Sequence, residues 1–302
     1  MGTSTFSCTI LQMLADTGYN VIGVVSQPDK PVGRKRVLQM TPVKELATSL
    51  GIPVYQPISL KNDASLLDGV NFDIIITCAY GQIIPKSLLA KPRLGCINVH
   101  ASLLPKYRGG APIQYAILKG EAESGISIMK TVFKMDAGPV YRQVTVDIND
   151  SDTYSILHDR LAIAGAKLLN ASLPAIFNET AVFIDQDESQ VSFAWNITKE
   201  DEHIHFNQEV KTVYNQIRAL LDKPAGFFLV SSKKIKIHEA TYERCETLQP
   251  GQVLGLDNHQ IVIAANNGVI RISRIQMEGK SVTDAASFWS GYHTFMENKI
   301  CD

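Results

Sequence analysis

Two polar side chains at the end of one predicted strand have the types and spacing for acyl-transfer chemistry. Asn98 and His100 close the apolar run 95–100, and residues two apart on a strand point to the same face. Open α/β sheets bind ligands at the carboxyl ends of their strands, where both residues fall. An amide that donates to a developing oxyanion, beside an imidazole that handles a proton, suits attack on a carbonyl carbon. The alternative, in which His100 only satisfies backbone groups at a strand end, stays open.

A third candidate, Asp136, lies in the turn 135–138 that follows the next predicted strand. Its carboxylate is a candidate for orienting His100 or a water molecule, although aspartate is also a common turn residue. Metal chemistry has little support, because His203 and His205 share one strand face but no third ligand stands at a useful spacing. The sequence also lacks the glycine-rich motifs of dinucleotide-binding folds and of P-loops.

Four cations gather in one short segment, at Lys30, Arg34, Lys35 and Arg36. The prolines and the glycine among residues 28–36 argue against a helix and predict a loop. A cationic loop can grip a phosphate backbone. A solvated surface loop is the plainer alternative, which the spacing alone favours.

The elements that must position these residues alternate in type over the first part of the chain. Strands are predicted at 21–25, 73–79, 95–100, 126–132 and 140–148, of which 73–79 and 95–100 are continuous apolar runs, and helices are predicted from Thr41 and from residues 151–152 to Phe177. Apolar runs without alternation are typical of strands that are buried on both faces. This order predicts an α/β fold with a Rossmann-like, mostly parallel sheet and helices on both faces. We expect this catalytic domain to cover residues 1–180.

The pattern changes after about Asn178. A polar stretch predicts a linker over 181–198, and a second domain is expected over 199–302. That domain begins with an amphipathic helix at 210–220, and after Gly226 the pattern predicts only short strands. The sequence Asn266-Asn267-Gly268 is typical of a hairpin turn. About five strands in so short a segment predict an OB-fold-like β-barrel.

Composition excludes several classes of protein. The 302 residues are 45% apolar and 20% charged, with a net charge of −1, which fits a globular protein and shows no global basic field for nucleic acid. The five cysteines are an odd number, lie far apart and form no Cys-x-x-Cys pair, so a disulfide framework is not expected and a reducing cytoplasm fits best. No apolar run approaches the ~18 residues that span a bilayer.

Four segments together resemble one family over nearly the whole chain: 26–34, 79–85, 98–114 and 135–138. In these segments the chain is similar to the methionyl-tRNA formyltransferases. The combination of Asn-x-His, Ser-Leu-Leu-Pro and Asp-x-Gly is shared by enzymes that use 10-formyltetrahydrofolate as the formyl donor. The basic loop and the pattern from Pro250 to Ile272 narrow the resemblance to this family, and the second domain is the more weakly matched one.

The resemblance implies a reaction in which the α-amine of methionine on initiator tRNA attacks the formyl carbon of 10-formyltetrahydrofolate. Asn98 and a protonated His100 would stabilise the oxyanion, and Asp136 would hold His100 and relay a proton through water. No metal is required. The residues that the family implies for the folate site are Ala79, Tyr80, Gly81, Ser102, Leu103, Leu104 and Pro105.

The resemblance also gives the basic loop a role. In the family this loop inserts into the tRNA acceptor stem, and Arg34 stands at its critical arginine position. Initiator tRNA is favoured because its weak or unpaired first pair is easily splayed, a selection by deformability. The barrel would contact the tRNA backbone. We expect a cytoplasmic monomer whose partners are the folate and the charged tRNA, with no membrane contact.

The first residues depart from the family pattern. The family has a central β-strand before a Gly-Thr-Pro-x-Phe turn, whereas this sequence starts at the turn, with Ser4 in place of the proline. A missing central strand would leave its neighbours with unpaired backbone groups, at about 1–3 kcal/mol for each buried group. We therefore expect the natural start to lie upstream of Met1.

Two other functions remain as alternatives. A sugar-nucleotide amine formyltransferase or a formyl-folate hydrolase would keep Asn98, His100 and Asp136 but would not need the basic loop. A tRNA- or RNA-binding protein without catalysis would use the barrel and the loop alone.

Overall fold

The computed structural model describes residues 1–302 except 34–35, 222–223, 247–248, 298 and 302. These residues form two compact units. The first unit comprises 1–112, 123–147 and 158–195, and the second comprises 113–122, 148–157 and 196–302. The helices α4 (Pro112–Leu118) and α5 (Tyr154–Phe177) each contribute to both units.

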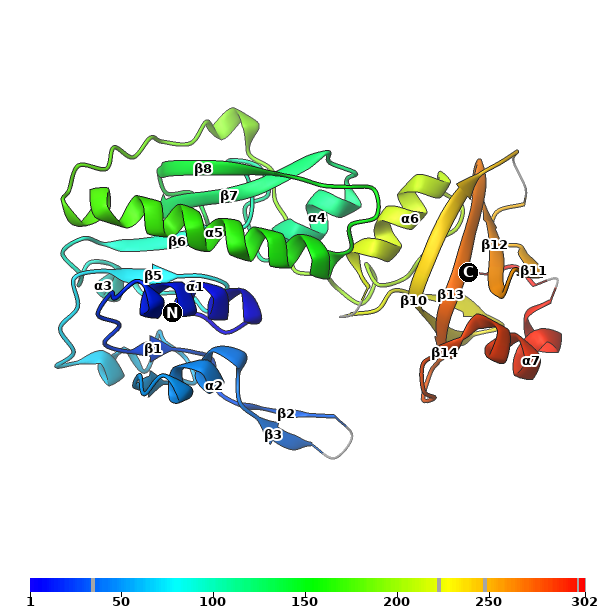
Figure 1. The fold of residues 1–302 in the computed structure, drawn as a ribbon, viewed down its shortest axis with the longest axis horizontal. Helices are drawn as coiled ribbons and strands as arrows, with labels where there is room; N and C mark the ends of the chain where they lie inside the picture. Colours follow the sequence, from blue (N-terminus) through cyan, green and yellow to red (C-terminus); the bar gives the residue numbers. More distant parts are fainter. Residues whose placement is uncertain (34–35, 222–223, 247–248, 298, 302) are drawn as a thin grey trace. The chain divides into compact units, whose positions relative to one another are not determined.

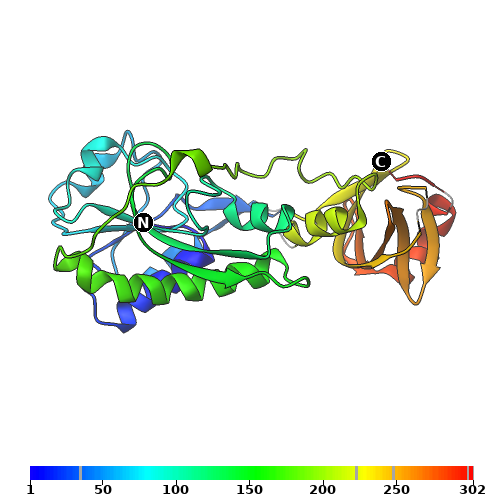
Figure 2. The same ribbon diagram turned by 90° about the horizontal axis from the view of Figure 1, so that it is seen from above.

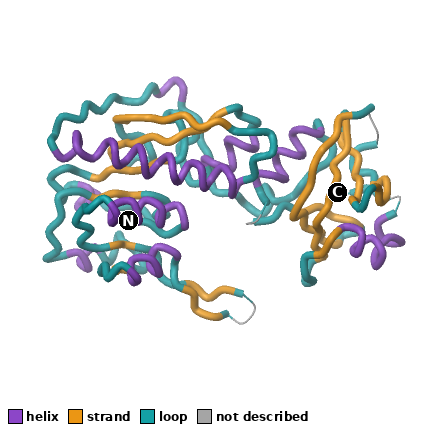
Figure 3. Tube along the Cα trace, in the orientation of Figure 1, coloured by secondary structure: helices purple, strands orange, loops and turns teal. Residues whose placement is uncertain are grey.

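The first unit alternates helices with strands along the chain, as Figures 1 and 3 show. Its other elements are α1 (Thr5–Asp16), β1 (Val24–Val25), β2 (Lys30–Val32), β3 (Val37–Gln39), α2 (Pro42–Ser49), β4 (Val54–Tyr55), η1 (Ala64–Leu67), β5 (Ile75–Thr77), α3 (Lys86–Leu89), β6 (Cys96–His100), β7 (Glu123–Lys130), β8 (Val140–Asp147) and η2 (Glu188–Gln190). Helix α2 begins where the sequence predicts, since the Thr41 side chain accepts a hydrogen bond from the Lys44 amide and Pro42 opens the helix.

The strands of this unit confirm the α/β class. Strands β5 and β6 pair in parallel, and β7 and β8 join them antiparallel in the order β5-β6-β7-β8. Strands β1 and β4 form a separate parallel pair, and β2 and β3 form a hairpin. The parallel pairing expected from the sequence therefore holds for the early strands, whereas β7 and β8 return as an antiparallel extension.

Helix α5 covers one face of β6 and leaves the opposite face uncovered by this helix. A Cβ on Gly165 of α5 would lie 3.0 Å from Val99 Cγ1 and 3.6 Å from Ile126 Cδ1, so the helix backbone comes close to β6 and β7 at this point. Val99 is buried against α5, and strand side chains alternate between faces. Asn98 and His100 therefore point to the opposite face of the sheet.

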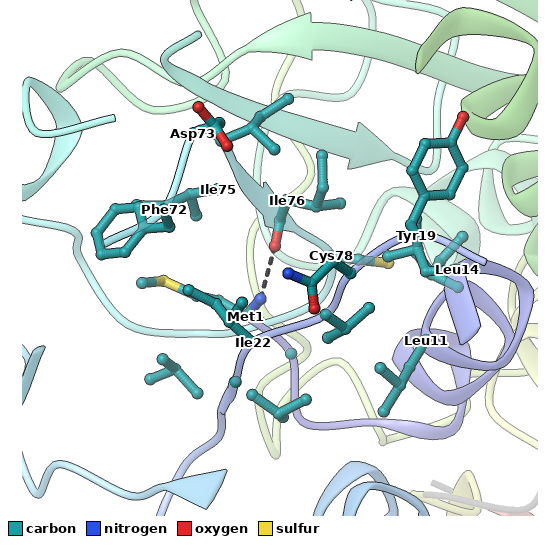
Figure 4. Close-up of a pocket in the computed structure, with 18 of the residues that line it drawn as sticks. Met1, Leu11, Leu14, Tyr19, Ile22, Phe72, Asp73, Ile75, Ile76 and Cys78 are labelled. Atoms are coloured by element: carbon teal, nitrogen blue, oxygen red, sulfur yellow. Dashed lines mark hydrogen bonds between the residues drawn. The ribbon is translucent and has the colours of Figure 1, made fainter. Parts of the chain in front are cut away.

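An apolar cavity of about 560 Å³ lies between the pair β1–β4 and the edge strand β5 (Figure 4). Residues 21–25 line one side of it and residues 72–76 the other. At one end Met1 and Gly2 join both sides, because the Met1 amine donates to Ile76 O at 2.6 Å and the Gly2 amide donates to Val25 O at 2.9 Å. Burial lowers the pKa of the Met1 amine. The cavity has room for a further strand between β1 and β5.

The second unit holds an antiparallel sheet around its own core. Its elements are α6 (Val210–Ala219), β9 (Phe227–Val230), β10 (Lys233–Arg244), β11 (Val253–Asp257), β12 (Gln260–Ala265), β13 (Gly268–Met277), β14 (Thr283–Asp284) and α7 (Ala285–Met296). The strand order is β11-β12-β13-β10-β9, with β14 on β13. Figure 2 shows the sheet curving round on itself, which is the OB-fold-like arrangement expected. The turn at Asn266 and Asn267 joins β12 to β13 as predicted.

One prediction for this unit was wrong, because the chain after Gly226 is not made of strands alone. Helix α7 follows β14, and the Asp284 side chain caps it by accepting from the Ser287 amide at 2.8 Å. Phe288 and Met296 bury one face of the helix in the core. The aspartate cap was the available signal for this helix.

The cavity between β1 and β5 makes a testable prediction about stability. Joining about six apolar, β-branched residues to Met1 should raise the midpoint of thermal unfolding by at least ~5 °C, because strand pairing would satisfy backbone groups and apolar side chains would fill the cavity. A glycine-serine extension of equal length is the control. Equal midpoints for the two extensions would count against a strand in this cavity.

Candidate active site

The His100 ring is fixed at the carboxyl end of β6. Its side chain is 7% exposed, and Nε2 lies 3.0 Å from the carbonyl oxygen of Tyr107. Because a carbonyl only accepts hydrogen bonds, Nε2 carries the proton in this contact. The other nitrogen, Nδ1, lies 3.8 Å from Asp136 Oδ2. Nδ1 is therefore the ring atom that can gain or lose a proton.

The Asp136 carboxylate is held by the loop that follows β6. Its Oδ2 accepts a hydrogen bond from the Gly109 amide at 2.9 Å, and its side chain is 19% exposed. Asp136 has a φ of 45°, a left-handed conformation in which aspartate and asparagine are enriched among residues other than glycine. The structure thus brings Asp136 to His100, as the sequence analysis expected.

Asn98 lies two residues before His100 on the same face of β6, and it is half-buried. Its Oδ1 accepts a hydrogen bond from Thr77 Oγ1 of β5 at 3.0 Å. This contact orients the amide so that its NH₂ group stays available as a donor. Asn98, His100 and Asp136 therefore lie together at one end of the sheet.

The loop 102–105 is anchored by its own polar groups. Ser102 is fully buried, and its Oγ donates to the Lys106 carbonyl at 2.6 Å. Ser127 of β7 donates to Ser102 O at 2.6 Å and accepts from the Leu104 amide at 3.1 Å. Leu104 is also buried, whereas Leu103 and Pro105 are half-buried. The structure therefore gives Ser102 and Leu104 a role in holding this loop, and Leu103 and Pro105 have the more accessible side chains.

The loop 79–81 follows β5 and combines two exposed residues with a buried one. Ala79 and Gly81 are exposed, whereas Tyr80 is buried in a core cluster, where burial raises its pKa to about 12. The Tyr80 carbonyl accepts from Thr3 Oγ1 and from Gln27 Nε2, each at 3.0 Å. The backbone of this loop, more than the Tyr80 side chain, is open to a ligand.

Of the basic segment, the described residues 30–33 and 36 belong to the hairpin of β2 and β3, whose strands project from the body of their unit in Figure 1. Lys30 starts the hairpin, is exposed, and donates to Gln27 Oε1 at 3.2 Å. Arg36 has a φ of 48° and is also exposed. The other two predicted tRNA-binding residues, Arg34 and Lys35, lie outside the described residues.

Sequence reasoning missed three residues beside the site. Arg108 is fully buried, donates from Nε to Gln186 Oε1 at 3.0 Å and forms an ion pair with Glu188 at 2.7 Å. Lys134 contacts the same carboxylate at 3.0 Å. Hydrogen bonds from Arg108 and then Lys134 lower the pKa of Glu188 to about 2. Nothing in the local sequence signals these contacts, which join residues 54 to 80 positions apart.

Two further properties bear on the type of site. Among the described residues, no group of three or more histidine, cysteine, aspartate or glutamate side chains is arranged to hold a metal ion. No helix in the described part of the chain has the length and apolar character to cross a membrane.

Comparison with known proteins places this chain in a family. The profile of the family described as “Formyl transferase” matches residues 1–173, and that of “Formyl transferase, C-terminal domain” matches 196–293. A methionyl-tRNA formyltransferase of Staphylococcus aureus (strain bovine RF122 / ET3-1) is 43% identical over 303 residues, covering 99% of this chain and 97% of the relative. One from Latilactobacillus sakei subsp. sakei (strain 23K) is 45% identical, covering 96% and 93%. Both domains of the chain match formyl transferase families, and the chain belongs to the methionyl-tRNA formyltransferase family.

Solved structures share the fold at lower identity. A sugar 3-N-formyltransferase, crystallised in the presence of dTDP and 5-N-formyl-tetrahydrofolate, has a TM-score of 0.69 at 20% identity, covering 93% of this chain and 97% of that one. HypX from Aquifex aeolicus, in complex with tetrahydrofolic acid, has a TM-score of 0.66 at 17% identity and covers 92% of this chain and 49% of that one. These likenesses establish the fold.

The ion pairs of Glu188 predict a pH dependence of stability. The pKa of this carboxylate falls from its ordinary 4.5 to about 2 on folding, so its contribution is complete above about pH 4.5 and is lost as the pH falls toward 2. Glu188→Gln should therefore lower the unfolding midpoint at pH 6, and the difference from the unmodified protein should shrink toward pH 2.5. Thermal unfolding measured across this range tests the prediction, and a difference independent of pH would contradict it.

Proposed function

We propose that this chain transfers the formyl group of 10-formyltetrahydrofolate to the α-amine of methionyl initiator tRNA. The observation that carries the proposal is the meeting of Asn98, His100 and Asp136 at one end of the sheet. The proposal is also supported by 43–45% sequence identity to methionyl-tRNA formyltransferases over nearly their whole length. The products would be N-formylmethionyl-tRNA and tetrahydrofolate.

The first step is attack of the neutral amine nitrogen on the formyl carbon. An α-amine has a pKa of about 8, so a base of modest strength is sufficient to keep it neutral. The carbonyl oxygen becomes an oxyanion in the tetrahedral intermediate. We assign its stabilisation to the Asn98 amide, whose oxygen is already engaged by Thr77 and whose NH₂ group remains a donor.

The second step is collapse of the intermediate, which breaks the bond from the formyl carbon to N10 of the folate. The attacking nitrogen loses a proton and the leaving nitrogen gains one. We assign this proton transfer to His100 Nδ1, because Nε2 is committed to the Tyr107 carbonyl. Asp136, 3.8 Å from Nδ1, would stabilise the imidazolium that forms. Once His100 has taken the proton from the attacking nitrogen, the imidazolium would share the stabilisation of the oxyanion with Asn98, and it would then pass this proton to N10.

The folate would lie along the loops 79–81 and 102–105. Both loops follow strands that end beside His100, and Ala79 and Gly81 leave exposed backbone at the entrance. Leu103 and Pro105 offer half-buried apolar surface for a planar ring. The buried residues of these loops would hold the two loops in shape without contacting the folate; they are Ser102, Leu104 and Tyr80.

The acceptor stem of the tRNA would contact the basic segment 30–36. The exposed Lys30 and Arg36 stand at the start and at the turn of the β2–β3 hairpin, which is a shape suited to insertion along a phosphate backbone. Arg34 and Lys35 complete the group of four cations in the sequence. We further propose that the protein acts as a monomer in the cytoplasm. The five free cysteines suit the reducing conditions of that compartment.

The direct test is formyl transfer from 10-formyltetrahydrofolate to methionyl initiator tRNA, with free methionine and an amino sugar nucleotide as competing acceptors. Asn98→Ala should lower kcat about 10²–10³-fold, and His100→Ala about 10²–10⁴-fold, with KM for the tRNA little changed. Transfer to the sugar and not to the tRNA would overturn the proposed acceptor. Full turnover by His100→Ala would overturn its assigned role.

Arg34→Ala tests the proposed contact with the tRNA. Loss of one phosphate contact should raise KM for the tRNA. It should also reduce the slope of log kcat/KM against log salt concentration by about one, while the Kd for the folate stays the same. Lys119→Ala, which changes an exposed cation outside the basic segment, is the matched control. An unchanged salt slope in Arg34→Ala would argue for an acceptor other than tRNA.

A further inference from the structure

The segment 184–195, which we call the strap, follows α5 and runs across the loops of the site. Its Ile184 exchanges two backbone hydrogen bonds with Val140, each 2.8 Å. Further along, the Arg108 amide donates to Ser192 O at 2.9 Å and the Ala194 amide donates to Arg108 O at 2.8 Å. The strap is thus bound at both ends, to the start of β8 and to the loop after β6. It lies within the span expected to be a linker, 181–198.

Between these ends, the side chain of Gln186 joins the turn 135–138 to Arg108, which lies in the loop after β6. Gln186 Nε2 donates to Asp136 O at 2.8 Å and to Gly138 O at 2.7 Å. Its Oε1 accepts from Arg108 Nε at 3.0 Å. Both donors and the acceptor of this half-buried amide are therefore used. No other residue type of this length supplies two donors and an acceptor on one planar group.

The turn that Gln186 holds is a strained one, and it carries the carboxylate that faces His100. Asp136 has a φ of 45°, a left-handed conformation that costs some free energy even for aspartate and that the surrounding contacts help to hold. The two bonds from Gln186 clamp the carbonyls on either side of Ala137. The carboxylate is then free to accept from the Gly109 amide at 2.9 Å and to stay 3.8 Å from His100 Nδ1.

We infer that Gln186 is a positioning residue for the formyl transfer: it sets the place of the Asp136 carboxylate relative to His100. This inference rests on the proposed function for its kinetic consequence. Among the residues that the structure describes, Gln186 makes its side-chain hydrogen bonds to Asp136, Gly138 and Arg108. Its loss should therefore act on the chemical step and leave substrate binding intact. A displacement of about 1 Å in such a group can lower a rate by about 10²-fold.

Gln186→Glu isolates this role. The variant keeps an acceptor for Arg108 but replaces the two donors with an oxygen that faces the Asp136 and Gly138 carbonyls. Gln190→Glu is the matched control, because Gln190 lies on the same strap, is exposed and donates to Asp187 at 2.9 Å. Gln186→Met, which removes the hydrogen bonds without adding charge, serves if the glutamate variant does not fold.

The expected kinetic result is a fall in kcat of about 10–100-fold for Gln186→Glu, with KM for tRNA and the Kd for folate within about twofold. Gln190→Glu should match the unmodified protein. Normal kcat in Gln186→Glu, or a loss confined to KM, would overturn the inference.

Amide hydrogen exchange gives a second readout that needs no activity. The Gly109 amide should exchange faster in Gln186→Glu than in Gln190→Glu, because its acceptor is the carboxylate that the strap positions. Unchanged exchange at Gly109 would overturn the inference even if the protein used another acceptor. Inactive unmodified protein with faster exchange in the variant would instead count against the proposed function alone.

Discussion

The hydrogen bond from the Gly109 amide to the Asp136 carboxylate is the contact on which the arrangement of the site depends. It joins the loop after β6 to the turn after β7, and without it the carboxylate has no fixed relation to His100. Both partners need unusual backbone. Gly109 has a φ of 126° and Asp136 a φ of 45°. A Cβ at position 109 would also overlap the Ala194 carbonyl, so glycine is what lets the strap lie so close.

The sheet supplies the second half of this geometry. Alternation along β6 sends Val99 toward α5 and leaves Asn98 and His100 on the other face. Hydrogen bonds from the neighbouring strands complete the arrangement. Thr77 of β5 orients the Asn98 amide, and Ser127 of β7 holds the loop 102–105 that follows β6. The arrangement of side chains at this end of the sheet therefore rests on ordinary strand pairing and on a few buried hydroxyl groups.

The sequence predicted those parts of the site that depend on local pattern. The two-residue spacing of Asn98 and His100 was enough to put them on one face, and the turn around Asp136 was visible from its glycine. The strap was not predictable in this way, because polar residues such as Gln186 look like linker until their distant partners are known. Helix α7 was missed although Asp284 gives it a cap, since the strands before it dominated the pattern. The resemblance to a family, not periodicity, suggested which loops face the folate.

The position of the strap in the chain has a consequence for biosynthesis. Strands β5 to β8 are complete by Asp147, yet the segment that clamps the Asp136 turn begins only at Ile184, after the 24 residues of α5. During synthesis, the sheet can therefore form before the turn is held. A ribosome that adds about 5–20 residues per second would leave the half-made unit without its clamp for several seconds. The order of the chain thus makes the geometry of the candidate site one of the last features of this unit to be established.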